Sequence, residues 1–104
     1  MDQPVETIVV TMEFDALDPA ALVKALARYV VVSRGQPGCR NIDLCGSSTI
    51  DGRFVVISKW ASTADQEAHF DSAEMVEMAR ACAGILRSPP RIDRLYGLSA
   101  HDLA

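Results

Sequence analysis

A β-hairpin is the strongest signal in the sequence, and it constrains the fold most. Two stretches rich in β-branched and aromatic residues, 39–50 and 53–60, flank the dipeptide Asp51-Gly52, which favours a type I′ turn. A two-residue turn would place Asp43 opposite Trp60 and Cys45 opposite Ser58. Because side chains alternate along a strand, one face of the hairpin is expected to carry Asn41, Asp43, Cys45, Phe54, Val56, Ser58 and Trp60, and the other Ile42, Leu44, Val55, Ile57 and Lys59.

One strand and one helix are predicted before the hairpin. Residues 5–14 are mostly β-branched and loosely alternating, which is typical of a strand. Asp18 and Pro19 then supply a helix N-cap and a proline at the first helical position. Apolar residues recur at helical spacing as far as Tyr29 and Val30, so we expect the helix to run to about Arg34.

Two helical stretches and a last strand are predicted after the hairpin. Ser62 and Asp65 resemble a capping box that opens a short helix. The chain breaks and recaps around Asp71-Ser72, and a second apolar helical pattern runs from there until Ser88-Pro89-Pro90 stops it. Residues 91–98 indicate the final strand, and residues 99–104 form a tail.

The order strand, helix, strand, strand, helix, strand indicates an α+β fold of the ferredoxin-like, split βαβ type. Such a fold has a four-stranded antiparallel sheet with helices on one face. We expect one domain spanning residues 1–104, with its core at about 5–98. The first strand is apolar on both faces at its centre, so we predict a homodimer that covers the sheet face opposite the helices.

Composition narrows the range of partners and compartments. At 104 residues, 49% of them hydrophobic, the chain is long enough for one domain with a buried core. Its net charge of −4 argues against binding nucleic acid or an anionic membrane surface. Three cysteines cannot close a disulfide framework, and neither a signal peptide nor a membrane span is evident. We therefore expect reduced thiols and a cytoplasmic location.

Three segments carry a family resemblance: the run 54–62 that contains Trp60, the run 68–72 that contains His69, and the preceding Gln36-Pro37-Gly38-Cys39. Together they resemble the antibiotic biosynthesis monooxygenase family, whose members have the dimeric α+β barrel fold. The resemblance extends from about Thr7 to Leu98. It implies an oxidase of quinols or an oxygenase of polyketides that works without metal or flavin, although the family also contains haem-degrading proteins.

The sequence departs from the family at several functional positions. Polyketide-oxidising relatives have Asn and Tyr where this chain has Val56 and Gln66, whereas Trp60 is kept. The histidine that binds iron in haem-degrading relatives corresponds to Ala79, which disfavours a haem role. Many members have a second His at the position of Glu74 and a Glu at the position of Ser58.

His69 is the candidate catalytic residue, because neutral imidazole can take a proton from a phenol or hydroquinone near pH 7. A packing or capping role at the break near Asp71 is the alternative interpretation. Trp60 could stack on an aromatic ligand or close the core at the end of its strand. The expected ligand pocket is formed by Val56, Trp60, His69, Met75 and Tyr96.

Other groups have both a functional and a structural interpretation. Tyr29 and Tyr96 could donate hydrogen bonds to a bound oxygen, or be core residues with solvated hydroxyls. The methionines at 12, 75 and 78 could line an adaptable apolar cavity or fill the core. Neither a C-x-x-C nor an H-x-x-x-H spacing occurs, and His101 lies in the tail, so no metal site is expected.

The sequence therefore favours a cofactor-independent monooxygenase that acts with dioxygen on a quinol-like or polycyclic phenolic small molecule. This interpretation follows mainly from the family resemblance, and it requires neither a cofactor nor a metal. The alternative is a non-catalytic small-molecule binding protein that keeps the fold and the cavity. An isomerase or decarboxylase of a small acid is a third hypothesis.

Overall fold

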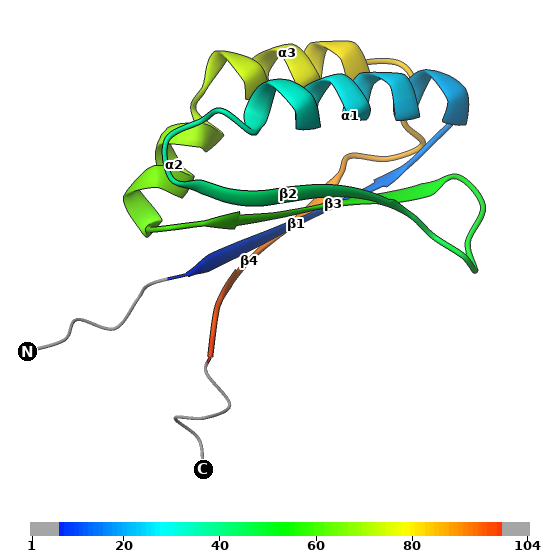
Figure 1. Cartoon of the computed structure of the whole chain (residues 1–104). Coiled ribbons are helices and arrows are strands. Elements are labelled where there is room, and N and C mark those ends of the chain that lie inside the picture. Colours follow the sequence, from blue (N-terminus) through cyan, green and yellow to red (C-terminus); the bar gives the residue numbers. More distant parts are fainter. Residues whose placement is uncertain (1–6, 99–104) are drawn as a thin grey trace, which may run out of the picture.

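The computed structural model describes residues 7–98, so the predicted strand start at Val5 and the predicted tail at 99–104 lie outside the described residues. The described elements confirm the ferredoxin-like α+β fold (Figure 1). The sheet is antiparallel with strand order β2-β3-β1-β4. In chain order the elements are β1 (Ile8–Asp15), α1 (Pro19–Ser33), β2 (Cys39–Gly46), β3 (Arg53–Trp60), α2 (Thr63–Phe70), α3 (Ala73–Cys82) and β4 (Arg91–Tyr96).

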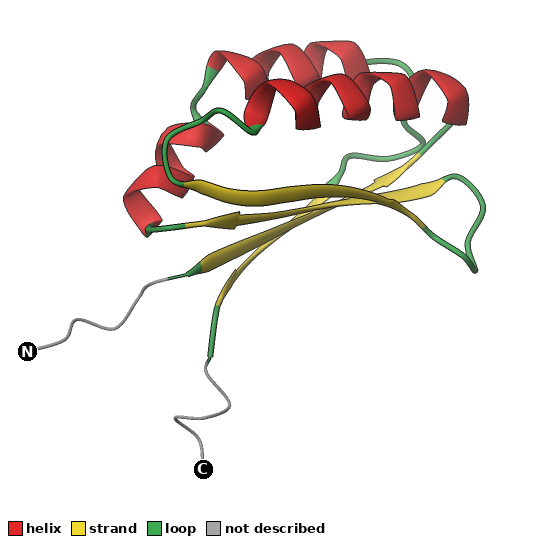
Figure 2. Cartoon of the chain, viewed as in Figure 1, coloured by secondary structure: helices red, strands yellow, loops and turns green. Residues whose placement is uncertain are grey.

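All three helices lie on the same side of the sheet, and the opposite face is bare of helices (Figure 2). Alternate residues of β1, namely Val10, Met12 and Phe14, are buried toward the helices. They pack with Leu22 and Leu26 of α1 in one hydrophobic core. No helix within residues 7–98 has the length and apolarity that crossing a membrane requires.

Side chains cap the start of each helix as the sequence predicts. Asp18 Oδ1 accepts a hydrogen bond from the Ala21 amide at 3.2 Å, and Ser62 Oγ accepts one from the Asp65 amide at 3.1 Å. Ser72 Oγ accepts from the Met75 amide at 3.3 Å, so the predicted break at Asp71-Ser72 separates α2 from α3. Capping residues of this kind satisfy backbone donors that have no partner within the helix.

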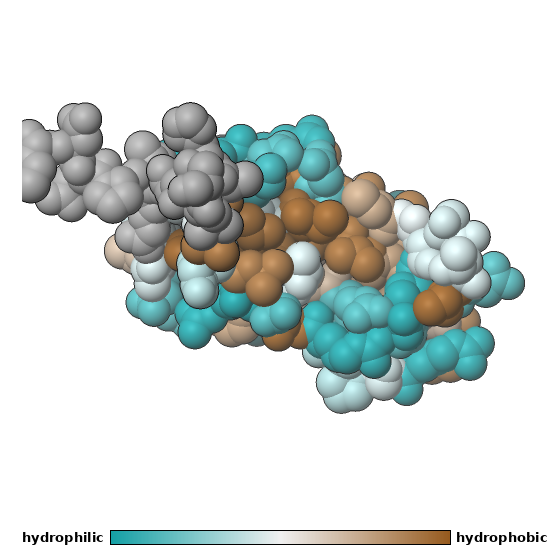
Figure 3. All heavy atoms as spheres, turned by 90° about the horizontal axis from the view of Figure 1, so that it is seen from below, coloured by the Kyte–Doolittle hydropathy of each residue, from teal (hydrophilic) through white to brown (hydrophobic). Residues whose placement is uncertain are grey.

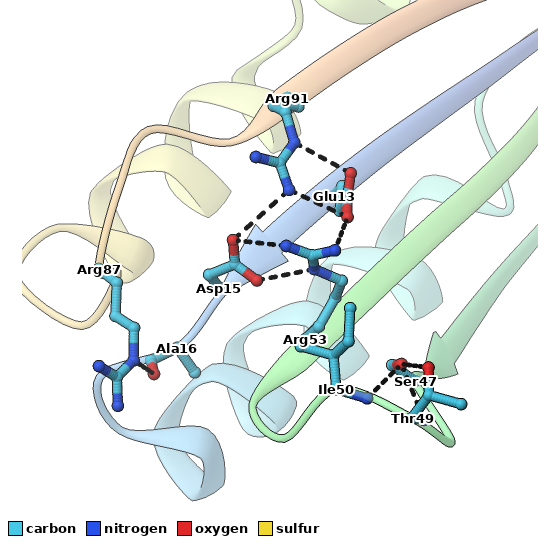
Figure 4. Close-up of polar contacts among 9 residues, drawn as sticks. All are labelled: Glu13, Asp15, Ala16, Ser47, Thr49, Ile50, Arg53, Arg87 and Arg91. Atoms are coloured by element: carbon cyan, nitrogen blue, oxygen red, sulfur yellow. Dashed lines mark hydrogen bonds and ion pairs between the residues drawn. The ribbon is translucent and has the colours of Figure 1, made fainter.

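The hairpin exists, but its turn is longer than predicted. Strand β2 ends at Gly46, and Ser47 Oγ accepts hydrogen bonds from the amides of Thr49 and Ile50 at 3.2 and 3.0 Å (Figure 4). Of the two turn residues only Gly52 has a positive φ, 76°, whereas a type I′ turn needs two such residues. The type I′ prediction is therefore wrong, because a serine-capped loop replaces the tight turn.

The longer loop changes the strand register. Ser58 faces Ile42 and Val56 faces Leu44, whereas Asp43 faces Ile57 and not Trp60. A shift by an odd number of residues exchanges the two faces of a strand. The predicted face assignment of β2 is thus wrong: Ile42 and Leu44 share the helix-covered face with Val56, Ser58 and Trp60.

A cluster of four charged side chains lies at one end of the open sheet face. Arg53 binds the Asp15 carboxylate with Nε and Nη2 at 2.9 and 3.2 Å, and its Nη1 lies 2.8 Å from Glu13 (Figure 4). Arg91 reaches the same two carboxylates at 3.0 and 3.6 Å. These arginines lower the pKa of Glu13 and of Asp15. The two positive and two negative charges therefore pair with one another.

Gly38 is expected to tolerate alanine poorly. Its φ is +77°, and an added Cβ would overlap the side chain of Asp65, which is hydrogen-bonded to the α2 cap Ser62. Gly84 is the matched control, because its φ is +81° but nothing lies within 4 Å of an added Cβ. We expect Gly84→Ala to lower the free energy of unfolding by about 1 kcal/mol and Gly38→Ala by about 2–3 kcal/mol in urea titrations. Equal losses would contradict the steric part of this prediction.

Candidate functional site

Three side chains from three elements meet in the core beside α2. Trp60 ends β3, His69 lies on α2, and Tyr29 lies on α1. The His69 ring stacks on Trp60 with centroids 4.4 Å apart and planes inclined by 25°. The Tyr29 hydroxyl lies 2.6 Å from His69 Nε2, which is a short hydrogen bond. His69 is only 4% exposed, so Trp60 and Tyr29 hold its ring in one orientation.

Burial sets the protonation state of this group. Desolvation lowers the pKa of His69, and the nearby charge of Glu74 opposes that effect. Burial likewise raises the pKa of Tyr29 to about 12. Both side chains are therefore neutral near pH 7. Among the described residues, His69 Nδ1 is buried and has no hydrogen-bond partner, so it is the nitrogen of this histidine that is left for another group.

The lowered pKa of His69 predicts a pH-dependent stability. An unfolded histidine takes a proton near pH 6.5, whereas the folded protein resists doing so until a lower pH. The free energy of unfolding should therefore fall as the pH drops below about 6.5, by less than about 1.4 kcal/mol per pH unit, the limit for one proton. Urea titrations from pH 7.5 to 5 on the parent and on His69→Gln measure this slope, which the variant should lack. An unchanged slope in the variant would contradict the prediction.

Two of the predicted pocket residues, Trp60 and Val56, belong to the core. The Trp60 indole donates from Nε1 to Ser58 Oγ at 2.9 Å, so both its ring and its polar group are used inside the protein. Trp60 and Val56 are fully buried. They therefore contribute packing at the end and middle of β3, beneath α2 and α1.

An apolar cleft of about 330 Å³ opens on the other side of α3 from this trio. Its walls come from β1, the end of α2, α3, the loop after α3, and β4. Cys82 is the titratable group in this lining, and burial raises the pKa of its thiol. The lining residues are Phe14, Phe70, Met75, Met78, Ala79, Cys82, Ala83, Leu86, Pro90 and Ile92.

A second hollow, of about 250 Å³, runs between α1 and α3. Tyr29 and Glu74 line it, and both act on His69: one by a hydrogen bond and the other through its charge. Met78 lines both this second hollow and the apolar cleft, so its side chain lies between the two. His69 itself lines neither hollow, and its contacts with Tyr29 and Glu74 relate it to this second one.

The structure brings some of the predicted site residues together and separates others. Trp60 and His69 stack, and Val56 is buried in the same core. Met75 lines the apolar cleft, as does Met78. Tyr96 lies on the edge strand β4 with 73% of its surface exposed and lines neither hollow. The functional roles of these residues remain predictions.

Sequence reasoning missed two features of the site. The first is the pairing of Tyr29 with His69: the sequence suggests either a donor to a bound oxygen or a solvated hydroxyl for Tyr29, but that group is buried against the imidazole. The second is that Phe14, Phe70 and Ile92 share the cleft with the methionines. Helical periodicity identifies buried faces but does not show which distant faces meet.

The described residues offer no group of three or more His, Cys, Asp or Glu side chains that could hold a metal ion. Cys39, Cys45 and Cys82 are free thiols in the structure. Burial raises the pKa of Cys39 as well as that of Cys82, so neither is activated as a thiolate. The described part of the site consists of an apolar cleft lining and, in the neighbouring core, a buried and neutral histidine.

The fold and cleft define a small ferredoxin-like α+β domain with an apolar cavity between sheet and helices. The sequence model of the antibiotic biosynthesis monooxygenase family matches residues 7–81. The chain therefore belongs to the antibiotic biosynthesis monooxygenase family, which confirms the resemblance noted in the sequence.

Solved structures share the fold over nearly the whole chain. A protein from Pseudomonas aeruginosa is 24% identical with a TM-score of 0.83, covering 94% of this chain and 100% of its own. A candidate antibiotic biosynthesis monooxygenase from Nitrosomonas europaea is 20% identical, with a TM-score of 0.81 and coverage of 94% and 95%. Another, from Caulobacter crescentus, is 20% identical, with a TM-score of 0.82 and coverage of 91% and 92%. No curated protein matches the chain.

Proposed function

We propose that the protein is a cofactor-independent monooxygenase that oxidises a quinol-like or polycyclic phenolic molecule with dioxygen. The observation that carries the proposal is the apolar cleft between α3 and the β1–β4 side of the sheet. Its volume of about 330 Å³ lies within the ~300–1,000 Å³ range of small-molecule sites. Flat aromatic rings suit such a lining, since methionine and phenylalanine side chains make favourable contacts with ring faces and edges.

The reaction needs a base and an electron-rich substrate. Loss of the phenolic proton gives a phenolate, which can pass electrons to dioxygen and form a carbon–oxygen bond at a ring carbon that carries hydrogen. Loss of water from the resulting hydroperoxide gives a quinone, so one atom of dioxygen enters the product and the other leaves in water. His69 is the proposed base, and Nδ1 is the nitrogen that would accept the proton.

Oxygen uptake tests this proposal. Metal-stripped protein is mixed with a panel of naphthols, anthrols and hydroquinones, and the rate of oxygen consumption is compared with that of the same compounds alone. The expected result is uptake above the spontaneous rate for at least one compound, with one atom from isotopically labelled dioxygen in the product. No uptake above the spontaneous rate across the panel would overturn the proposal.

A non-catalytic binding protein is the second candidate, and one observation favours it. His69 is not among the residues that line the cleft: its Nε2 is bonded to Tyr29, and its Nδ1 is buried. A proton from a ligand in the cleft would reach Nδ1 only after a neighbouring side chain moves. Saturable binding of the same aromatic compounds, without turnover, would favour this function over the first.

We further propose that the open sheet face forms a homodimer. Val9, Ile57 and Leu95 contribute apolar surface there, and Figure 3 shows apolar surface in the middle of this face between hydrophilic margins. Such surface is rarely left uncovered. We expect sedimentation to give twice the chain mass of 11.3 kDa, and Ile57→Lys to give the monomer. Val31→Lys, on the exposed side of α1, is the control that should leave the dimer intact. A parent that sediments as a monomer at micromolar concentration would contradict the dimer.

A further inference from the structure

The apolar cleft adjoins a third hollow that has a different chemical character. This third hollow, of about 360 Å³, shares Phe70 and Ile92 with the cleft, and its other lining residue is Arg94. An apolar surface beside α3 therefore lies next to a cationic group at the edge of the sheet. None of the functions considered above uses this arginine.

The strand register explains why Arg94 lies at this position. On β4, Ile92 faces Met12 and Arg94 faces Val10 of β1. Met12 and Val10 point toward the helices, so Ile92 and Arg94 point to the same side. Because β4 is an edge strand that no helix covers fully, the Arg94 side chain is 57% exposed and stands at the mouth of the cleft.

The contacts of the Arg94 guanidinium with residues 7–98 are made by one nitrogen. Its Nη1 donates a hydrogen bond to Oε1 of Gln66 at 3.2 Å, and Gln66 is 2% exposed on α2. The same Nη1 lies 3.9 Å from a carboxylate oxygen of Glu67, a long contact between two exposed side chains that contributes little. Within residues 7–98, Nε and Nη2 make no hydrogen bond. The guanidinium is thus oriented by a neutral partner while its other edge stays open.

Another arginine of this protein binds a carboxylate with the same two nitrogens, Nε and Nη2. Arg53 uses Nε and Nη2 to hold both oxygens of Asp15 at 2.9 and 3.2 Å (Figure 4). Paired N–H donors in this fixed geometry match the two oxygens of a carboxylate. Arg94 offers the same two donors beside an apolar cleft, with no carboxylate of the described chain bound to them.

We propose that the natural ligand is an aromatic carboxylic acid, with its rings in the apolar cleft and its carboxylate on Nε and Nη2 of Arg94. This inference rests on the proposed function for the use of the cleft, and it narrows the substrate class from a phenol to a phenol that carries an acid group. The net charge of −4 repels anions from the protein as a whole, so the attraction is local to Arg94.

Matched probes test the carboxylate contact. The probes are 2-naphthoate and 2-naphthamide, which share shape and rings but differ in charge, and their dissociation constants are measured by calorimetry at low salt. The parent is expected to bind the acid about tenfold more tightly than the amide, as a charge-assisted contact at a half-exposed site allows. Arg94→Gln should abolish this preference, so that the acid and the amide bind to the variant equally.

A second arginine provides the control. Arg40 belongs to β2, the other edge strand, and lines neither the cleft nor the hollow that contains Arg94, so Arg40→Gln removes the same charge away from the site and should keep the tenfold preference. If the parent binds both probes equally, or the preference survives Arg94→Gln, the inference is overturned while the cleft remains a ligand site. If neither probe binds to the parent, the cleft is not a site for aromatic molecules, and the inference falls together with the proposed function.

Discussion

Replacing Trp60 with alanine is expected to lower the free energy of unfolding by about 3–5 kcal/mol, the range for deleting a large buried aromatic ring. The indole is fully buried and stacks on His69. Its removal also deprives Ser58 Oγ, which is almost fully buried, of its hydrogen-bond donor. An unsatisfied buried oxygen adds to the loss of packing.

Two further variants show whether this loss comes from burial. Trp60→Phe keeps an aromatic face against His69 but loses the Nε1 donor, so it should destabilise less than alanine does. Tyr96→Ala removes an aromatic side chain that is mostly exposed, and it should change the free energy of unfolding by no more than about 0.5 kcal/mol. Urea titrations at pH 7 measure all three. A Trp60→Ala loss as small as that of Tyr96→Ala would show that the stack does not stabilise the fold.

Most of the fold could be predicted from local patterns. Capping residues at Asp18, Ser62 and Ser72 mark where helices begin, because each satisfies free backbone donors. The alternation of apolar residues along β1 was visible in the sequence, and the order of elements then leaves few possible topologies. These signals act over three or four residues, so one sequence is enough to detect them.

The hairpin shows where local reasoning fails. Asp51-Gly52 is a strong turn signal, but Ser47 captures two amides of the loop and widens it. The turn residue Gly52 is used in a different turn, in which Asp51 keeps a negative φ. Since register depends on loop length, the wider loop accompanies the exchange of the buried and exposed faces of β2. Nothing in the dipeptide itself reveals that competition.

The site was harder to predict than the fold, because its contacts join distant parts of the chain. Tyr29 and His69 are 40 residues apart, and the sequence gives no sign that α1 and α2 bring them together. The family resemblance drew attention to Trp60 and His69, and these two do meet. It could not show that both rings are buried in the core, nor that the open cleft is lined by Met75 and not by these two residues.

Loss of His69 is expected to slow the proposed oxygenation by about 10²–10⁴-fold, the usual contribution of a general base. The tautomer that can act as the base carries its hydrogen on Nε2 and donates it to the Tyr29 oxygen at 2.6 Å, which leaves the Nδ1 lone pair to accept the proton. Protonation at Nδ1 keeps the Nε2–H hydrogen bond to Tyr29, and the charge of Glu74 favours the cation. His69→Gln is the variant of choice, since it keeps a polar side chain of similar length above Trp60.

Tyr29→Phe separates the role of the base from that of its partner. This change leaves Nδ1 in place and removes only the oxygen that stabilises protonated His69, so we expect a loss of about tenfold, the value of one hydrogen bond. It should also move the acidic limb of the pH–rate profile, whereas His69→Gln should remove that limb. Oxygen uptake from pH 5 to 9, on variants whose urea titrations confirm folding, provides the measurement. Equal rates for the parent and His69→Gln at every pH would exclude His69 as the base.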